Sequence, residues 1–194
     1  MSRFHVISHY LGVLSVFLAI GAGSARANRI LAPLCEIPAW QTAQVQAQPT
    51  PTNANAETLA LAQAELNWIA EKKGWKKASL PTIKTAPERT LAIMLFGTPE
   101  GFEGIFPKAL YDRALHVLYL SDRLTLDAVL DRSILLHELV HHLQVFNDIE
   151  FECREEAEAQ AYELQVQWLS ENGVKDPYAL MGIPRQQITN LQCL

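Results

Sequence analysis

Hydrophobic residues first recur at helical spacing in residues 57–73. Leu59, Leu66 and Ile69 lie on one side of a helical wheel, and residues with high helix propensity dominate the segment. Gly74 follows the last charged turn, at a position where glycine commonly ends a helix. The pattern predicts an amphipathic helix over this segment.

The middle of the chain carries shorter hydrophobic patterns. Leu91–Phe96 (LAIMLF) is an apolar run between charged residues and a glycine, which predicts a buried strand. Glycines and prolines in residues 97–107 indicate a loop. In Leu110–Ser121 a turn-like Tyr-Asp-Arg precedes alternating hydrophobic residues, Val117 and Tyr119 among them. We expect a hairpin, or at least one strand, in this segment.

Two longer helices are predicted in the second half of the chain. Residues Thr125–Phe146 and about Cys153–Leu169 carry helical spacing, and Asn172-Gly173 closes the second helix. The tail from Val174 is irregular, with room for one helical turn. A helix, strands and two further helices in this order predict an α+β fold.

The helix predicted at Thr125–Phe146 contains His137-Glu138-Leu139-Val140-His141. Hydrophobic residues occupy nearly its whole helical wheel, so we expect a central, buried helix. Two histidines at i and i+4 share one face and are close enough to bind a single metal ion. The glutamate between them is then placed to act as a base. The alternative is a pair of core histidines that hydrogen-bond to the backbone.

A third ligand is expected on the next helix. Glu158 lies in the middle of its apolar face, where a buried carboxylate needs a cation. Glu156 falls on a polar stripe and is interpreted as solvated, whereas Glu155, nearer the turn, is the reserve candidate. If the two helices form an antiparallel hairpin, His141 and Glu158 lie at similar distances from its turn and meet across the interface.

The HELVH sequence and the downstream glutamate, in an E-x-x-A setting, resemble the gluzincin branch of the zincin metallopeptidases, particularly its small single-domain members. The likeness covers residues 125–169, and the whole chain resembles uncharacterised secreted bacterial proteins with the same two motifs. The resemblance implies a compact zincin-like domain with an N-terminal helix, a small β-sheet, an active-site helix and a glutamate helix. It also implies a Zn²⁺ site with the ligands His137, His141 and Glu158, and with Glu138 as general base.

Three features distinguish the chain from better-known zincins. The metzincin branch is excluded, because its longer motif needs glycine and histidine where this chain has Gln144 and Asn147. Compared with the larger gluzincins, the two motif helices are joined by a very short loop. The aspartate often found four residues after the ligand glutamate is Tyr162 here. The resemblance therefore does not indicate which residues hydrogen-bond to the metal ligands.

A zinc site of this kind would hydrolyse amide bonds. Three protein ligands leave zinc an open position for water, whose proton Glu138 takes and passes to the leaving amine. By the same resemblance, His116–Leu120 is expected to be the edge strand that holds an extended peptide. Five residues remain candidates for the oxyanion donor: His142, His116, Tyr119, Tyr111 and Tyr162.

The first 27 residues have the features of a cleavable signal peptide. Arg3 supplies a positive charge, an apolar run follows, and Ala25-Arg26-Ala27 offers small residues for cleavage. The run is shorter than the roughly 20 residues that cross a bilayer, so we expect no stable membrane span after processing. Residues 28–56 are interpreted as an N-terminal arm and a flexible linker, because residues 41–56 contain almost no large apolar side chains.

Composition limits the partners and the compartment. Removing residues 1–27 leaves 14 basic against 21 acidic residues, a formal charge of −7, which disfavours nucleic acid as a partner. Of three cysteines, Cys153 and Cys193 are the preferred disulfide, because that bond ties the tail to the start of the glutamate helix. Cys35 is the expected unpaired thiol.

We therefore predict an exported, periplasmic or secreted, zinc-dependent metallopeptidase domain in residues 57–194, acting on a peptide or protein. The alternatives are a non-catalytic zinc-binding structural or interaction protein on the same scaffold, and a metal-free binding module. Sequence leaves the substrate, the cleavage preference, exopeptidase or endopeptidase action and the oligomeric state open.

Overall fold

The computed structural model describes residues 50–97 and 106–193, which belong to the unit Pro49–Leu194. These residues form six helices and a four-stranded sheet, so the fold is α+β, as predicted. Among them, no helix is both long and apolar enough to cross a bilayer. The signal peptide, the arm with Cys35 and most of the linker lie outside the described residues.

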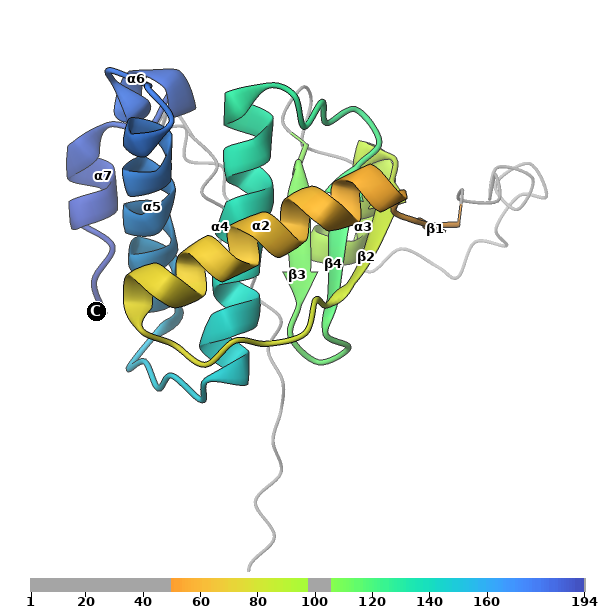
Figure 1. Cartoon of the computed structure of the whole chain (residues 1–194), viewed down its shortest axis with the longest axis horizontal. Helices are drawn as coiled ribbons and strands as arrows, with labels where there is room; N and C mark the ends of the chain where they lie inside the picture. The colour runs from red at the N-terminus through yellow and green to blue at the C-terminus, as the bar shows by residue number, and fades with distance from the viewer. Residues whose placement is uncertain (1–49, 98–105, 194) are drawn as a thin grey trace, which may run out of the picture. The chain divides into compact units, whose positions relative to one another are not determined.

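Helix α2 (Ala56–Lys73) confirms the first predicted helix. The Asn55 side chain caps its start by accepting a hydrogen bond from the Thr58 backbone N–H at 2.8 Å. Gly74 ends it with a left-handed φ of 65°, which glycine adopts without steric cost. In Figure 1, α2 crosses in front of α4, and the two helices pack together.

The sheet has the strand order β1-β2-β4-β3. β3 (Ala109–Asp112) and β4 (Val117–Ser121) form the predicted antiparallel hairpin, and β2 (Thr82–Ala86) pairs with β4 in parallel. β1 (Thr52–Asn53) adds to the other side of β2. The backbone of β4 is therefore paired on both sides, while β3 and β1 form the edges of the described sheet.

Helix α4 (Val129–Phe146) and helix α5 (Arg154–Glu171) confirm the two motif helices, although α4 begins four residues later than predicted. α4 packs against α5, α2 and both strands of the hairpin, which makes it the central element. Two short helices, α6 (Pro177–Met181) and α7 (Arg185–Thr189), pack against α5.

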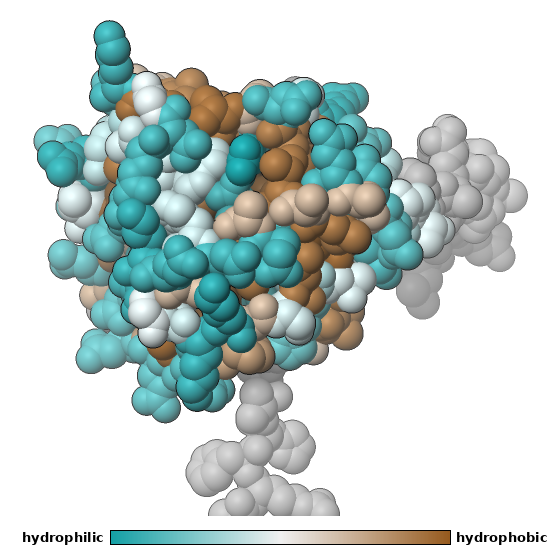
Figure 2. All heavy atoms as spheres, in the orientation of Figure 1, coloured by the Kyte–Doolittle hydropathy of each residue, from teal (hydrophilic) through white to brown (hydrophobic). Residues whose placement is uncertain are grey.

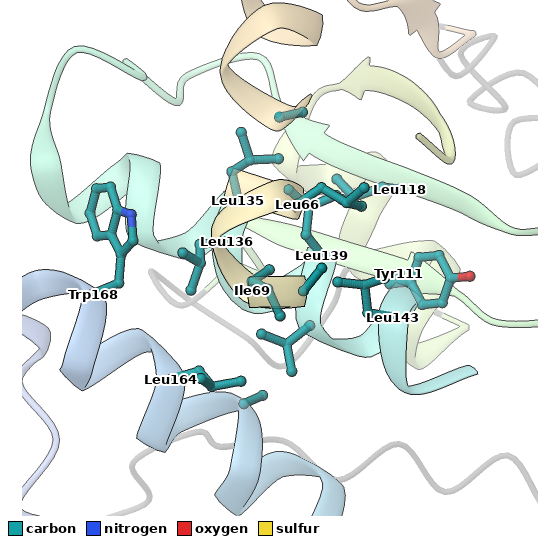
Figure 3. Packing of buried hydrophobic residues seen from close by; sticks show 14 of the residues in the cluster. Leu66, Ile69, Tyr111, Leu118, Leu135, Leu136, Leu139, Leu143, Leu164 and Trp168 are labelled. Carbon is teal, nitrogen blue, oxygen red and sulfur yellow. The ribbon is translucent and has the colours of Figure 1, made fainter. Parts of the chain in front are cut away.

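A single large hydrophobic cluster joins these elements, as Figure 3 shows. α2, α4, α5 and the sheet contribute side chains that are almost wholly removed from water, which favours the folded state by about 25 cal/mol per Å² of apolar surface. On the face drawn in Figure 2, hydrophilic residues cover much of the surface. The labelled core residues in Figure 3 are Leu66, Ile69, Tyr111, Leu118, Leu135, Leu136, Leu139, Leu143, Leu164 and Trp168.

One predicted strand is wrong. Leu91–Phe96 belongs to helix α3 (Glu88–Phe96), which starts after Pro87 and ends at Gly97 with a φ of 77°. Proline pre-sets the backbone at a helix start and glycine permits the left-handed end, so these two residues enclose one short helix. A six-residue apolar run has no periodicity that separates a buried strand from a buried helix.

Three segments carry more structure than predicted. β2 is a strand that the sequence interpretation did not assign. The end of the predicted linker forms β1, whose Thr52 hydroxyl lies 2.8 Å from the Thr85 hydroxyl. The tail, for which one helical turn was expected, forms α6 and α7. Each of these elements is short and depends on pairing or packing with a distant segment, which local patterns do not encode.

The preferred disulfide is confirmed. Cys153, at the start of α5, is bonded to Cys193, which lies 40 residues later in the chain. The bond closes a loop that contains α5, α6 and α7. It therefore ties the C-terminal segment to the end of α5 that carries Glu158.

We predict that replacing both Cys153 and Cys193 by serine lowers the free energy of unfolding by about 2–4 kcal/mol, because the open loop gains conformational entropy in the unfolded chain. Denaturant unfolding of both proteins, with and without reductant, measures the difference. Reductant should destabilise the wild type and leave the double variant unchanged. Equal stability of the oxidised wild type and the variant would contradict this contribution.

Candidate metal centre

Helices α4 and α5 bring the predicted ligands together. They lie side by side in Figure 1 and are joined by residues 147–153, so they form the expected antiparallel pair. His137 and His141 lie one turn apart on α4, and Glu158 lies in the second turn of α5. Ala161 is fully buried on the facing side of α5, where its small side chain permits close approach of the two helices.

Three side-chain atoms converge between the helices. His137 Nε2 lies 3.2 Å from Glu158 Oε2, and His141 Nε2 lies 3.4 Å from the same oxygen. The two Nε2 atoms are 3.3 Å apart. The side chains are only 10%, 7% and 16% exposed for His137, His141 and Glu158 respectively, so water has little access to this point.

The hydrogen-bond partners of Gln165 fix the proton position on His137. The Ser133 hydroxyl donates to the Leu130 carbonyl oxygen at 2.7 Å, and that oxygen has no proton to give. Ser133 Oγ must then accept from Gln165 Nε2, 2.9 Å away. The other end of this amide, Oε1, lies 3.1 Å from His137 Nδ1. His137 Nδ1 is therefore a donor, so in the neutral ring Nε2 is the unprotonated nitrogen and faces Glu158.

Gln144 fixes the proton on His141 in the same way. Its Nε2 donates to the backbone oxygen of Ala157 at 3.0 Å and to Gln160 Oε1 at 3.1 Å. Its Oε1 consequently faces His141 Nδ1 at 2.9 Å and accepts the proton there. In their neutral forms, both imidazoles thus present unprotonated Nε2 atoms to the same point.

Three electron-pair donors that face one another repel unless a cation lies among them. In a tetrahedral zinc site with bonds of about 2.0–2.1 Å, neighbouring ligand atoms lie about 3.3–3.4 Å apart. The three separations here are 3.2, 3.3 and 3.4 Å. The three separations therefore match those between ligand atoms around a tetrahedral ion of this size.

The pKa shifts of Glu158 and His137 also indicate that the centre favours a positive charge. Burial by itself would raise the pKa of Glu158, but hydrogen bonds and charge interactions with both histidines hold it far below its ordinary value. Burial would likewise lower the pKa of His137, yet the neighbouring Glu158 carboxylate raises it above its ordinary value. In the absence of a metal, the His137–Glu158 pair therefore binds a proton more readily than a free histidine does.

Arg154 contacts the second carboxylate oxygen of the candidate ligand Glu158. Its Nε lies 3.3 Å from Glu158 Oε1, and its side chain is 40% exposed. The two carboxylate oxygens therefore have separate partners, the guanidinium on one side and the imidazoles on the other. The reserve ligand Glu155 is absent from this cluster, and Glu156 accepts a hydrogen bond from the Glu152 backbone N–H.

Glu138 is half-buried on α4, directly after His137. Its charge contributes to the raised pKa of His137, so it lies near that ring. Within the described part of the chain, no hydrogen bond or ion pair occupies its carboxylate. The group is available to accept a proton.

Most of the proposed oxyanion donors have other partners. The Tyr111 hydroxyl lies 3.0 Å from Nδ1 of both His116 and His142, and His142 Nε2 donates to the Ser79 carbonyl oxygen at 2.9 Å. Tyr119 is buried in a separate small hydrophobic cluster. The ring of the remaining candidate, Tyr162, packs edge-on against His137 with the ring centroids 4.6 Å apart.

The expected peptide-binding strand is also corrected. His116–Leu120 largely coincides with β4, whose backbone groups are engaged by β2 and β3 on its two sides. A strand paired on both sides has no free edge for a peptide. Of the two hairpin strands, only β3 lies at an edge of the described sheet.

The comparisons with known proteins place the chain in a family. Residues 53–184 match the model of a family described as a domain of unknown function, DUF6647. The chain belongs to this family. No curated protein and no solved structure matches it significantly. The matched residues include α4, α5 and all three atoms of the candidate centre.

We predict that Glu158→Gln lowers the pKa of His137 in the metal-free protein below its ordinary value of about 6.5, because the carboxylate is lost while burial remains. In the wild type, the raised folded-state pKa means that the His137–Glu158 pair stabilises the fold below the unfolded-state pKa. That contribution is lost as the pH rises through the folded-state pKa. An NMR titration of the histidine rings measures the shift.

Glu163→Gln is the matched control, because Glu163 is exposed on the same helix. It should leave the titration of His137 unchanged. The same His137 pKa in wild type and Glu158→Gln would contradict the predicted interaction.

Proposed function

We propose that this protein binds one zinc ion through His137 Nε2, His141 Nε2 and Glu158 Oε2 and hydrolyses peptide bonds with it. The single observation that carries the proposal is the convergence of three potential ligand atoms, two imidazole nitrogens and one carboxylate oxygen, at a buried point. In an ordinary pair of neutral core histidines, each ring donates from one nitrogen and accepts from a donor at the other. Here the Nδ1 ends donate to amide oxygens, while the Nε2 ends face each other and a carboxylate oxygen.

The donor atoms favour zinc over the hard cations. Calcium and magnesium are bound mainly by oxygen atoms in shells of six or more ligands, whereas zinc accepts imidazole nitrogen together with carboxylate oxygen in a shell of four. The centre offers two nitrogens and one oxygen at the separations that tetrahedral zinc requires, so it matches zinc rather than calcium or magnesium. Three protein ligands are also typical of catalytic rather than structural zinc.

Glu138 supports hydrolysis as the reaction. Zinc bound by three protein ligands acidifies a water molecule and polarises a carbonyl oxygen. The Glu138 carboxylate is half-buried and makes no hydrogen bond to another described residue. It would take a proton from the zinc-bound water and deliver it to the leaving amine. These roles are those implied by the gluzincin resemblance, with α4 as the active-site helix and α5 as the glutamate helix.

We further propose that the protein acts outside the cytoplasm on a peptide or protein. The disulfide between Cys153 and Cys193 supports an oxidising compartment, as does the signal-like sequence of the first 27 residues. β3, an edge strand of the described sheet, replaces β4 as the strand on which an extended peptide would pair.

A second function is favoured by the position of the centre between two helices. A metal that links α4 to α5 would stabilise the fold without catalysing any reaction. Both functions predict zinc binding and a lower melting temperature after chelation. They differ only in the effect of Glu138.

We predict one zinc per chain in the purified protein, measured by elemental analysis against protein concentration. Replacing any one of His137, His141 and Glu158 by alanine should reduce the bound zinc to a small fraction, because two ligands hold the ion weakly. His116→Ala, which changes an exposed histidine outside the centre, should retain it. Full zinc occupancy in all three ligand variants would contradict the assignment.

We predict that Glu138→Gln retains zinc and loses at least about 100-fold in hydrolysis of a peptide library, because general base catalysis contributes about 10²–10⁴-fold. The amide has nearly the same shape but accepts no proton. Glu163→Gln is the matched control and should keep both zinc and activity. If zinc is bound and neither wild type nor control cleaves any peptide, the structural role is supported and the peptidase is contradicted.

A further inference from the structure

Two buried glutamines contact the outer nitrogens of the candidate zinc ligands. Gln165 is 4% exposed and Gln144 is 2% exposed, although glutamine normally lies at the surface. Each accepts the Nδ1 proton of one imidazole, at 3.1 Å on His137 and 2.9 Å on His141. Packing alone does not explain why two buried amides each accept a hydrogen bond from one of the two candidate ligand rings.

We propose that Gln144 and Gln165 are positioning residues that set both imidazoles in the zinc-binding tautomer before any metal arrives. The inference rests on the proposed zinc site and extends it to the residues that prepare that site. A neutral imidazole can carry its proton on either nitrogen, and only the Nδ1–H form offers Nε2 to a metal. An acceptor fixed at Nδ1 selects this form and holds the plane of the ring.

Both amides are themselves held by groups with little freedom. Gln165 is anchored through Ser133 to the Leu130 carbonyl oxygen on α4. Gln144 is anchored to the Ala157 carbonyl oxygen, which lies on α5 next to Glu158. The Gln144 contact therefore joins a ligand of one helix to the backbone beside the ligand of the other.

The supporting groups are neutral amides, whereas the more usual partner of a zinc-bound histidine is a carboxylate or a backbone carbonyl oxygen. Amides orient the rings without adding negative charge. Two neutral imidazoles and one carboxylate then leave the ion and its ligands with a net positive charge. An added carboxylate at Nδ1 would make the ring a stronger ligand.

The two positions should respond differently to glutamate. At position 165 the second partner is the Ser133 hydroxyl, which can rotate to donate to a carboxylate. At position 144 the amide N–H groups meet Gln160 Oε1 and the Ala157 carbonyl oxygen, and this carbonyl oxygen would face a carboxylate oxygen with no proton between them. Gln165→Glu therefore preserves the acceptor at the imidazole, whereas Gln144→Glu creates a repulsion.

The test is the zinc dissociation constant of the purified protein, measured by competition with a chelator of known affinity. Gln165→Met keeps the approximate volume and removes the acceptor, so it should weaken zinc binding by about 10–100-fold. Gln165→Glu should bind zinc at least as tightly as the wild type. Gln144→Glu should bind it more weakly than the wild type.

The control is Gln167→Met, two residues along α5, where the exposed glutamine contacts Glu171 and neither imidazole. It should leave the zinc affinity unchanged. A second readout is the nitrogen NMR spectrum of the metal-free protein above the folded-state pKa of His137. There the wild type should show His137 in the Nδ1–H form and Gln165→Met a mixture of tautomers.

Unchanged zinc affinity and an unchanged His137 tautomer in Gln165→Met would overturn the positioning role while leaving the zinc site intact. Equal weakening by Gln165→Met and Gln165→Glu would also overturn it, because the loss would then follow from altered packing. Absence of zinc binding by the wild type would overturn both this role and the proposed function. Zinc binding without peptidase activity would contradict the proposed function alone, since the affinities still decide the positioning role.

Discussion

Two backbone carbonyl oxygens, those of Leu130 and Ala157, determine the chemistry at the buried contact between α4 and α5. Neither can donate a proton, so each forces the direction of the hydrogen bonds that lead from it to an imidazole. In the neutral rings, the result is a pair of unprotonated Nε2 atoms beside the Glu158 carboxylate. Because little water reaches this point, only a cation relieves their mutual repulsion.

The rest of the fold keeps these atoms in place. α4 is enclosed by α2, α5 and the hairpin, so its backbone and the two histidines have little freedom. The disulfide fixes the start of α5, one turn before Glu158, and Ala161 lets the two helices approach each other. The hydrophobic core therefore also fixes the position of α4 relative to α5, which keeps His137 and His141 opposite Glu158.

The convergence of the three candidate ligands could be predicted from sequence, whereas the residues that contact their outer nitrogens could not. His137, His141 and Glu158 lie on two long helices, whose regular geometry turns sequence spacing into position in space. The residue type of Gln144 and Gln165 gave no such signal, since a glutamine in a helix usually faces water. Gln144 lies three residues after His141 and Gln165 seven residues after Glu158, on the same helix faces, and this spacing was the available clue. α3 was mistaken for a strand because its apolar run is too short to show a period.

Anomalous X-ray diffraction at the zinc absorption edge, from crystals of the zinc-loaded protein, tests the shared metal ligation most directly. A single strong peak should lie about 2.0–2.2 Å from His137 Nε2, His141 Nε2 and Glu158 Oε2, with the Nδ1 atoms turned away toward the two glutamines. A peak elsewhere, or the absence of any peak within bonding distance of these three atoms, would contradict the account.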